Sequence, residues 1–233
     1  MEKIKNIIVV IPSLNPDNRL VNLVEELIDY GVKKIIVIND GSVSDSLSYF
    51  KKVSEKEECK LLVHEVNRGK GRALKTAFSY CEEIEDCYGV ITVDGDGQHL
   101  VKDIIACMEA MYQNRNKVVL GVRDFSTHGV PFRSKFGNEV TKRMLRLLCG
   151  IHISDTQTGL RGIPAGYLKE FISYQGERYE YETNMLLMMK KNGVEWTEVK
   201  INTVYLDNNI RSHFNPIKDS WRIYKIILKS KSV

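Results

Sequence analysis

Features typical of secreted and membrane-spanning proteins are scarce in this sequence of 233 residues. Its five cysteines are scattered and never spaced as C-x-x-C, which argues against both a disulfide framework and a zinc site. The longest fully apolar run near the start covers residues 7–11, far short of the ~20 residues that a membrane-spanning helix needs. We therefore expect a cytoplasmic protein with reduced thiols, without a secretory signal or a membrane span.

Low-complexity composition and a strong overall charge are missing as well. The chain has 16 Gly and 5 Pro, is 43% hydrophobic and 27% charged, and carries a formal net charge of +4, which excludes collagen-like and disordered chains. The positive charge is concentrated in residues 208–233, where six Lys and Arg residues stand against Asp219 and the net charge is +5. We expect this tail to meet an anionic partner, and we expect no nucleic-acid partner.

Apolar runs and helical periodicity alternate through the first half of the chain. Residues 7–11 form a continuous apolar run that Pro12 ends, which is typical of a strand buried on both faces. The pattern predicts strands at residues 7–11, 34–38, 60–66, 89–93 and 117–120, with helices at 20–28, 44–52, 73–81 and 104–111 between them. This order predicts an α/β fold with a mostly parallel central sheet, helices on both faces, and ligands at the carboxyl ends of the strands.

The second half of the sequence is less regular. It predicts helices at residues 138–148 and 184–190, a glycine-rich stretch at 159–166, a strand at 196–205 and a last helix from residue 217. We divide the chain into one domain, residues 1–207, and a basic amphipathic helix within residues 208–233.

Two common nucleotide-binding loops are missing. Residues 12–16, after the first strand, contain no glycine, so the G-x-G-x-x-G fingerprint of dinucleotide-binding proteins is not there. The segment at residues 69–72 has the sequence Gly-Lys-Gly-Arg, without the third glycine of that fingerprint and without the Ser or Thr with which a P-loop holds magnesium. Both classes are therefore excluded.

The most specific motif is the segment 94–99, which directly follows a predicted strand. It places Asp94, Asp96 and Gln98 at alternate positions, and their hard oxygen donors suit Mg²⁺ or Mn²⁺ far better than zinc. Such ions usually take further ligands from phosphates, which indicates a phosphorylated substrate. The alternative is a plain Asp-Gly turn. We favour the metal site and leave His99 unassigned.

Three further loops carry polar residues to the same predicted sheet edge. Asp40 follows the second strand, where it has the right chemistry to bind a ribose or a base, or to cap a helix. Lys70 lies in a glycine-flanked loop before a helix and suits an anion, although a solvated turn is the alternative. Residues 123–135, including Arg123, form either a lid for an anionic acceptor or a solvated basic loop.

Taken together, these motifs resemble those of a known family. Segments 8–15, 39–42, 67–71, 94–99, 155–162 and 198–199, together with Arg123, occur in the order found in family-two glycosyltransferases. Over about the first 200 residues the chain most resembles their polyprenyl-phosphate branch, typified by dolichyl-phosphate mannosyltransferase. The resemblance implies a GT-A fold, a nucleotide-diphosphate sugar as donor, Mg²⁺ or Mn²⁺ as cofactor, and inversion at the anomeric carbon.

The resemblance also implies roles for individual residues. Asp94 and Asp96 match the family's acidic metal-binding pair, Gln98 matches a further metal ligand, and Arg123 matches a basic residue near the diphosphate and the acceptor.

Other matched positions would bind the nucleotide sugar. Pro12, Asn15 and Asp40 match positions that line the nucleotide. We also predict that Lys70 and Asp94 bind the nucleotide sugar. Two departures occur: Pro16 stands where relatives usually have Glu, and Arg211 with Ser212 stands at a different spacing from the Arg and Ser-Lys pair of relatives. We include Arg211 and Ser212 among the predicted diphosphate contacts.

The chemistry of the acceptor decides whether a base is needed. A lipid phosphate is already ionised near neutral pH and needs cations to hold it, whereas a sugar hydroxyl needs a carboxylate within hydrogen-bond reach. Asp155 and Glu182 are the candidate bases. We therefore predict that Asp96, Arg123, Glu182 and Asp155 carry catalysis, and we expect cations to stabilise the departing diphosphate.

The last predicted helix bears on the same question. Ile217, Trp221, Tyr224 and Leu228 repeat at helical spacing, and Lys218, Arg222, Lys225 and Lys229 follow one residue later. This pattern suits peripheral contact with an anionic membrane, or with a membrane partner, and equally a helix that packs its stripe on the domain.

The sequence therefore predicts an inverting transferase that acts on a polyprenyl phosphate at the cytoplasmic membrane face. Two alternatives stay open, namely transfer to a saccharide hydroxyl in cell-wall or polysaccharide synthesis, and a non-catalytic nucleotide-sugar-binding subunit. Homo-oligomerisation is possible with either.

Overall fold

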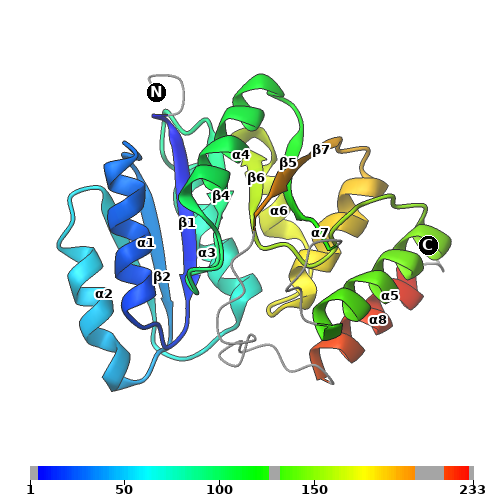
Figure 1. Cartoon of the computed structure of the whole chain (residues 1–233), viewed down its shortest axis with the longest axis horizontal. Helices are drawn as coiled ribbons and strands as arrows, with labels where there is room; N and C mark the ends of the chain where they lie inside the picture. Colours follow the sequence, from blue (N-terminus) through cyan, green and yellow to red (C-terminus); the bar gives the residue numbers. More distant parts are fainter. Residues whose placement is uncertain (1–4, 126–131, 203–217, 231–233) are drawn as a thin grey trace.

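The chain folds around one seven-stranded sheet (Figure 1). The structure is a computed structural model, and it describes residues 5–125, 132–202 and 218–230. The strand order is β3-β2-β1-β4-β6-β5-β7, and every neighbouring pair is parallel except those that involve β6. The strands are β1 Ile7–Ser13, β2 Ile35–Asp40, β3 Cys59–His64, β4 Gly89–Thr92, β5 Val118–Arg123, β6 Arg161–Pro164 and β7 Trp196–Ile201. The predicted α/β class with a mostly parallel sheet is confirmed.

Helices cover both faces of the sheet, which explains why the central strands are apolar on both sides. Ile8 and Val10 of β1 face one core together with α3, α5, α6, α7 and α8, whereas Ile7, Val9 and Ile11 face the other with α1, α2 and α4. The helices are α1 Asn18–Asp29, α2 Leu47–Ser54, α3 Lys70–Glu82, α4 Val101–Gln113, α5 Phe132–Cys149, α6 Leu168–Ser173, α7 Glu180–Lys191 and α8 Lys218–Ser230, with 3₁₀ turns at Ser44–Ser46 and Ala165–Tyr167. Successive side chains of a strand point to opposite faces of the sheet, so the same strand contributes apolar side chains to both cores.

The prediction for the second half of the chain needs three corrections. The glycine-rich stretch at residues 159–166 contains strand β6, which pairs antiparallel with both β4 and β5. Its four residues, Arg-Gly-Ile-Pro, lack the apolar run of the other strands, and it is buried because its neighbours enclose it. Helix α6 was not predicted. The strand predicted at 196–205 ends at Ile201, and residues 203–205 lie outside the described part.

Of the two interpretations of the last helix, the one in which the stripe of Ile217, Trp221, Tyr224 and Leu228 packs on the domain is not what the described residues show. In α8 the side chains that face the core are Ile223 and Ile227, because the helix packs against α5 and α7. Trp221 and Leu228 are instead 67% and 55% exposed, and Ile217 lies outside the described residues. Among the helices that the structure describes, none is both long and apolar enough to cross a membrane.

Candidate functional site

The parallel strands bring the predicted motifs to one edge of the sheet. β1, β2, β4 and β5 run in the same direction, so the loops that follow them, with Asn15, Asp40, Asp94 and Arg123, open at the same side of the molecule (Figure 1). This is the side where open α/β sheets bind their ligands. Residues 211 and 212, predicted to contact a diphosphate, lie outside the described part of the chain.

Lys70 joins two carboxylates that come from distant parts of the chain. Its Nζ lies 2.7 Å from Oδ1 of Asp94, just beyond β4, and 3.0 Å from Oε1 of Glu182 on α7. Burial by itself would lower the pKa of Lys70, but the charges of Asp94 and Glu182 outweigh it and raise this pKa. Burial likewise works against the ionised form of Asp94, yet the Lys70 charge holds the pKa of Asp94 well below its usual range. The three groups therefore form a charged cluster in which Glu182 is buried and Lys70 and Asp94 are half-buried.

Asp96 lies beside this cluster in a different electrostatic setting. Burial, and then the charge of Asp94, raise the pKa of Asp96 above its usual value. The backbone N–H of Gln98 donates to Asp96 Oδ1 at 3.0 Å. A divalent cation would relieve exactly this kind of carboxylate repulsion, so the donor set of Asp94, Asp96 and Gln98 fits Mg²⁺ or Mn²⁺. Within the described ranges no three His, Cys, Asp or Glu side chains converge on one point.

A glycine makes room for Asp94. A Cβ added at Gly159 would lie 2.3 Å from Asp94 Oδ2, so a larger residue cannot occupy this position without displacing the carboxylate. The hydroxyl of Thr92 on β4 donates to the carbonyl oxygen of Gly159 at 2.7 Å and holds the loop in place. The glycine-rich stretch therefore forms the back wall of the acidic site.

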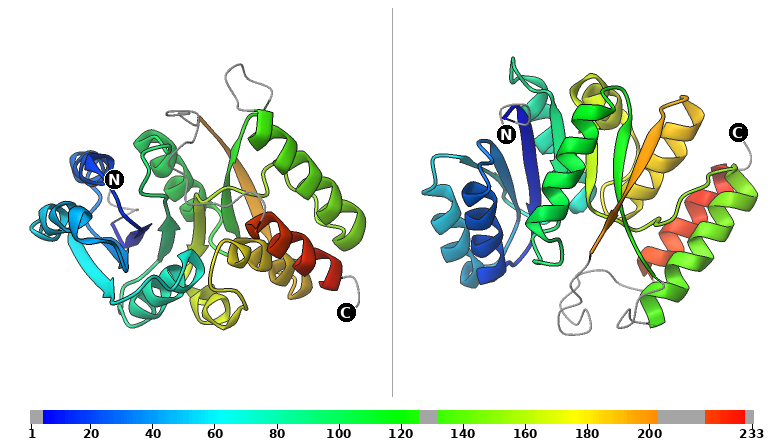
Figure 2. Two further views of the ribbon diagram at one scale, coloured as in Figure 1. Left: turned by 90° about the horizontal axis from the view of Figure 1, so that it is seen from below. Right: turned by 45° about the horizontal axis from the view of Figure 1, so that its top comes forward.

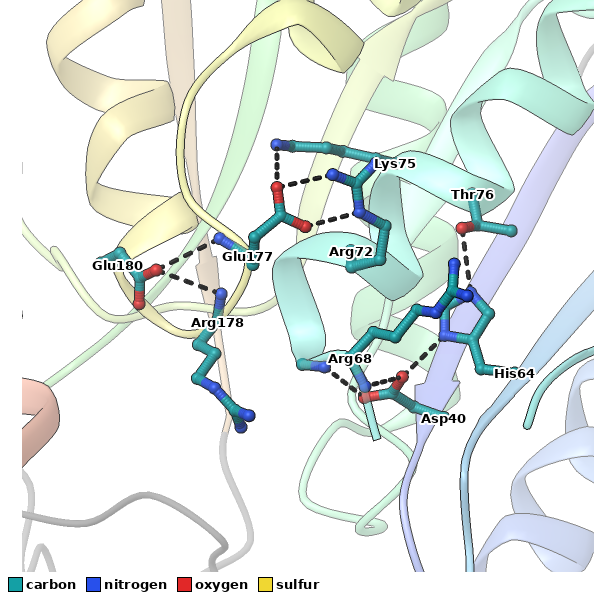
Figure 3. A network of polar contacts seen from close by, with 10 residues as sticks. Asp40, His64, Arg68, Arg72, Lys75, Thr76, Glu177, Arg178 and Glu180 are labelled. Atoms are coloured by element: carbon teal, nitrogen blue, oxygen red, sulfur yellow. Dashed lines mark hydrogen bonds and ion pairs between the residues drawn. The ribbon is translucent and has the colours of Figure 1, made fainter. Parts of the chain in front are cut away.

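Asp40 is buried and bonded within the protein (Figure 3). Its Oδ1 lies 2.7 Å from Nδ1 of His64 and accepts the backbone N–H of Arg68, and its Oδ2 accepts the N–H of Gly69 at 2.8 Å. The Asp40 side chain is 5% exposed. The structure thus assigns Asp40 a holding role for the loop before α3, and contact with a nucleotide stays a prediction.

His64 is a site residue that sequence reasoning missed. Its Nε2 lies 3.0 Å from Oγ1 of Thr76 on α3, so the ring links β2, β3 and α3 (Figure 3). A signal was present, because β2 and β3 are parallel neighbours and His64 pairs in register with Asp40. Only the pairing of the two strands reveals it.

The segment before α7 fastens the first turn of α3 (Figure 3). Glu177 accepts from Nε and Nη2 of Arg72 at 2.5 and 2.7 Å and from Lys75 at 3.2 Å. The Arg72 backbone N–H donates to the Glu177 carbonyl oxygen at 2.9 Å. Glu180 in turn accepts the backbone N–H groups of Glu177 and Arg178. These bonds fix Lys70 and Glu182 relative to each other.

Arg123 and Asp155, which were predicted separately as catalytic residues, form an ion pair with each other. Nε and Nη2 of Arg123 donate to the two carboxylate oxygens of Asp155 at 2.6 and 3.0 Å, and the backbone N–H of Gln157 donates to Oδ1 at 3.0 Å. Asp155 is 0% exposed. The two carboxylate oxygens are therefore occupied by donors from the protein.

Arg161 is a second residue that the motif analysis left without a role. It is 1% exposed, and its Nε and Nη1 donate to the carbonyl oxygens of Thr158 and Glu182 at 3.0 and 2.7 Å. Burial lowers the pKa of this guanidinium, while the charges of Glu182 and Asp155 oppose that effect. Arg161 thus ties the loop behind Asp94 to α7.

The first loop is tied to the second. The Asn15 N–H donates to Ser42 Oγ at 2.8 Å, and Asn15 Oδ1 accepts the Val43 N–H at 2.9 Å. Asn15 adopts φ 48°, a conformation that Asn tolerates better than most residues. Pro12 is half-buried near the end of β1. The two predicted nucleotide-lining residues therefore lie at the site edge.

Comparisons with known proteins show the family and the fold of the chain. A family model described as Glycosyl transferase family 2 matches residues 8–172. A UDP-N-acetylglucosamine–dolichyl-phosphate N-acetylglucosaminyltransferase of Methanococcus voltae is 26% identical over 243 residues, covering 96% of each protein. A dolichyl-phosphate beta-glucosyltransferase of Trichomonas vaginalis is 22% identical over 218 residues, covering 82% of this chain and 65% of that protein.

Solved structures show the same fold. TarS 1-349 of S. aureus in complex with UDP-GlcNAc aligns with a TM-score of 0.58 at 16% identity, over 97% of this chain and 66% of that one. GalNAc-T7 with UDP, GalNAc and Mn²⁺ aligns with a TM-score of 0.59 at 15% identity, over 96% of this chain and 48% of that one. This chain therefore spans less than two thirds of either structure, and both support the GT-A arrangement of the sheet.

We predict that Gly159→Ala displaces Asp94 and lowers the free energy of unfolding by about 1–3 kcal/mol, as overpacking does in a filled site. Gly166→Ala is the matched control, because a Cβ at Gly166 meets nothing within 4 Å. Urea unfolding of both variants measures the difference, and a crystal structure shows the carboxylate. Equal stability of the two variants would contradict the tight fit.

Proposed function

We propose that this chain, which belongs to glycosyl transferase family 2, transfers a sugar with inversion from a UDP- or GDP-sugar to a polyprenyl phosphate. The observation that carries the proposal is the cluster in which Lys70 pairs with Asp94 beside Asp96, at the ligand-binding edge of the sheet. Acidic oxygen donors next to a fixed ammonium suit a diphosphate that arrives with Mg²⁺ or Mn²⁺. The relatives named for dolichyl phosphate support the acceptor class.

In this proposal the residues of the chain bind and orient the two substrates. Asp94, Asp96 and Gln98 would hold the cation, which supplies charge neutralisation at the departing diphosphate. Lys70 stabilises the same negative charge from the first turn of α3. An oxygen of the acceptor phosphate forms a bond to the anomeric carbon as the bond from that carbon to the diphosphate oxygen breaks, and the nucleoside diphosphate leaves with the electron pair.

The direct test measures donor binding and turnover in the purified protein. UDP, GDP and their sugars are compared by thermal shift with and without Mn²⁺, because a ligand that binds the folded state raises its melting temperature. Sugar transfer to undecaprenyl phosphate is then measured, and we expect Asp96→Asn to reduce the rate of transfer about 100-fold or more. Stabilisation without transfer would support the binding-subunit alternative. The absence of both stabilisation and transfer would contradict the proposal.

The two candidate bases favour a phosphate acceptor over a hydroxyl acceptor. Asp155 is fully buried, and its oxygens accept from Arg123 and Gln157. Glu182 lies 3.0 Å from the Lys70 ammonium, and its side chain is 10% exposed. Both carboxylates are therefore already engaged by donors of the protein itself, whereas a phosphate oxygen needs no base.

We therefore predict that Glu182→Gln retains transfer to polyprenyl phosphate within about tenfold, since removal of a true general base costs ~100-fold or more. Steady-state kinetics give the turnover number for the variant and for the control Glu195→Gln, whose side chain is 70% exposed and pairs with Lys117. A loss of turnover beyond 100-fold in Glu182→Gln alone would favour the saccharide-hydroxyl reaction.

Peripheral contact with the inner face of a membrane would follow from a lipid acceptor. α5 and α8 lie side by side at one end of the molecule, and both begin beyond strands, β5 and β7, that end at the site edge (Figures 1 and 2). On α5, Phe136 and Leu147 are 59% and 81% exposed and lie three turns apart on one helix face. These residues add apolar contact area to the exposed Trp221 and Leu228 of α8.

Basic residues surround this apolar surface on α8. Lys218, Arg222, Lys225 and Lys229 all belong to the described helix, and its one acidic residue, Asp219, is buried and pairs with Arg222 at 3.1 Å. Cations beside exposed aromatic and aliphatic side chains fit an anionic bilayer, at ~1 kcal/mol for each cation near the surface.

We expect the full chain to bind phosphatidylglycerol vesicles more tightly than phosphatidylcholine vesicles, and less tightly at high salt. The double variant Leu147→Glu/Leu228→Glu should lose most of this binding in co-sedimentation. Val63→Glu on β3 is the matched control, because Val63 is 61% exposed and lies on the opposite edge strand of the sheet. Equal binding by all three proteins would place the lipid contact elsewhere.

A further inference from the structure

We infer that Lys70 makes cation binding at the acidic pair depend on the donor diphosphate, because its ammonium occupies Asp94 until a phosphate draws it away. The inference rests on the proposed function and adds to it the dependence of cation binding on the diphosphate. In the free protein the Lys70 Nζ lies 2.7 Å from the carboxylate that the cation needs. A divalent ion approaching Asp94 therefore meets a like charge in contact with its own ligand.

The backbone around Lys70 keeps the ammonium in this place. Lys70 is the first residue of α3, and the preceding Gly69 donates its N–H to Asp40. A Cβ at Gly69 would lie 2.5 Å from the Glu177 carbonyl oxygen, so the segment before α7 closes over this turn. The Lys70 side chain is 15% exposed, and its Nζ lies 6.0 Å from the centroid of the Tyr179 ring. The ammonium is thus held between two carboxylates by a rigid frame.

A diphosphate offers Lys70 a replacement partner within the reach of the same side chain. Phosphate oxygens accept charge-assisted hydrogen bonds from a lysine ammonium, so the Lys70 side chain suits them. When the ammonium turns to a phosphate, Asp94 becomes available to the cation, and the diphosphate supplies the remaining ligands. Diphosphate and cation therefore raise each other's affinity, as linkage requires.

Glu182 keeps the Lys70 ammonium paired while the ammonium exchanges Asp94 for a phosphate. The ammonium keeps a second carboxylate at 3.0 Å, so it does not lose all its neutralising contacts when it leaves Asp94. A cation alone brings no group that could replace the Lys70 contact.

The test is a Mn²⁺ titration of the full chain without nucleotide, followed by the electron paramagnetic resonance signal of free Mn²⁺. We expect weak binding by the wild type and at least tenfold tighter binding by Lys70→Met. Lys70→Arg keeps the charge and should behave as the wild type. Lys75→Met is the matched control, because Lys75 lies on the same helix and pairs with Glu177. Circular dichroism verifies folding.

A second readout uses the wild type and needs no stable Lys70 variant. With ¹⁵N-labelled lysine, addition of UDP or GDP without metal should shift the Nζ resonance of Lys70. An unchanged resonance under saturating nucleotide, or equal Mn²⁺ affinities of wild type and Lys70→Met, would overturn the inference. Sugar transfer can persist in either case, so these outcomes differ from a failure of the proposed function, in which no nucleotide binds or no sugar moves.

Discussion

The contact of one half-buried ammonium with two carboxylates is the interaction on which the site depends. Lys70 comes from the start of α3, Asp94 from the end of β4 and Glu182 from α7, so a single charge connects three elements. Three like-charged or isolated groups at this depth would be unstable, and their mutual neutralisation makes the cluster possible. The surrounding bonds of Asp40, Glu177 and Arg161 serve to keep these elements in place.

Much of this arrangement is visible in the sequence, because it follows from strand order. Apolar runs such as residues 7–11 mark buried parallel strands, and Asp94 and Asp96 stand where such a strand ends. The carboxyl ends of parallel strands share an edge, so the proximity of the first, second and fourth loops could be expected. The mostly parallel fold was predicted on this basis, and the family was predicted from the motifs that resemble it; both are confirmed.

The rest depends on tertiary contacts that have no local pattern. Strand β6 is four residues long and contains Arg, Gly and Pro, and only its neighbours make it a strand. Glu182 reads as an exposed helical charge, yet the packing of α7 buries it beside Lys70. In α8 two apolar stripes compete, and contact with α5 and α7 selects Ile223 and Ile227. Local sequence does not decide between such alternatives.

The reversed direction of β6 has a consequence for how the protein could diversify. Because β6 starts at the edge where its neighbours end, the chain returns to the site through the loop at residues 155–160. Lys70, Asp94 and Asp96 precede this loop, whereas Glu182, which pairs with Lys70, follows it, and Gly159, which makes room for Asp94, lies within it. An exchange of the second half of the chain would therefore have to retain Gly159 and Glu182, because the pair of Asp94 and Lys70 would otherwise lose its support.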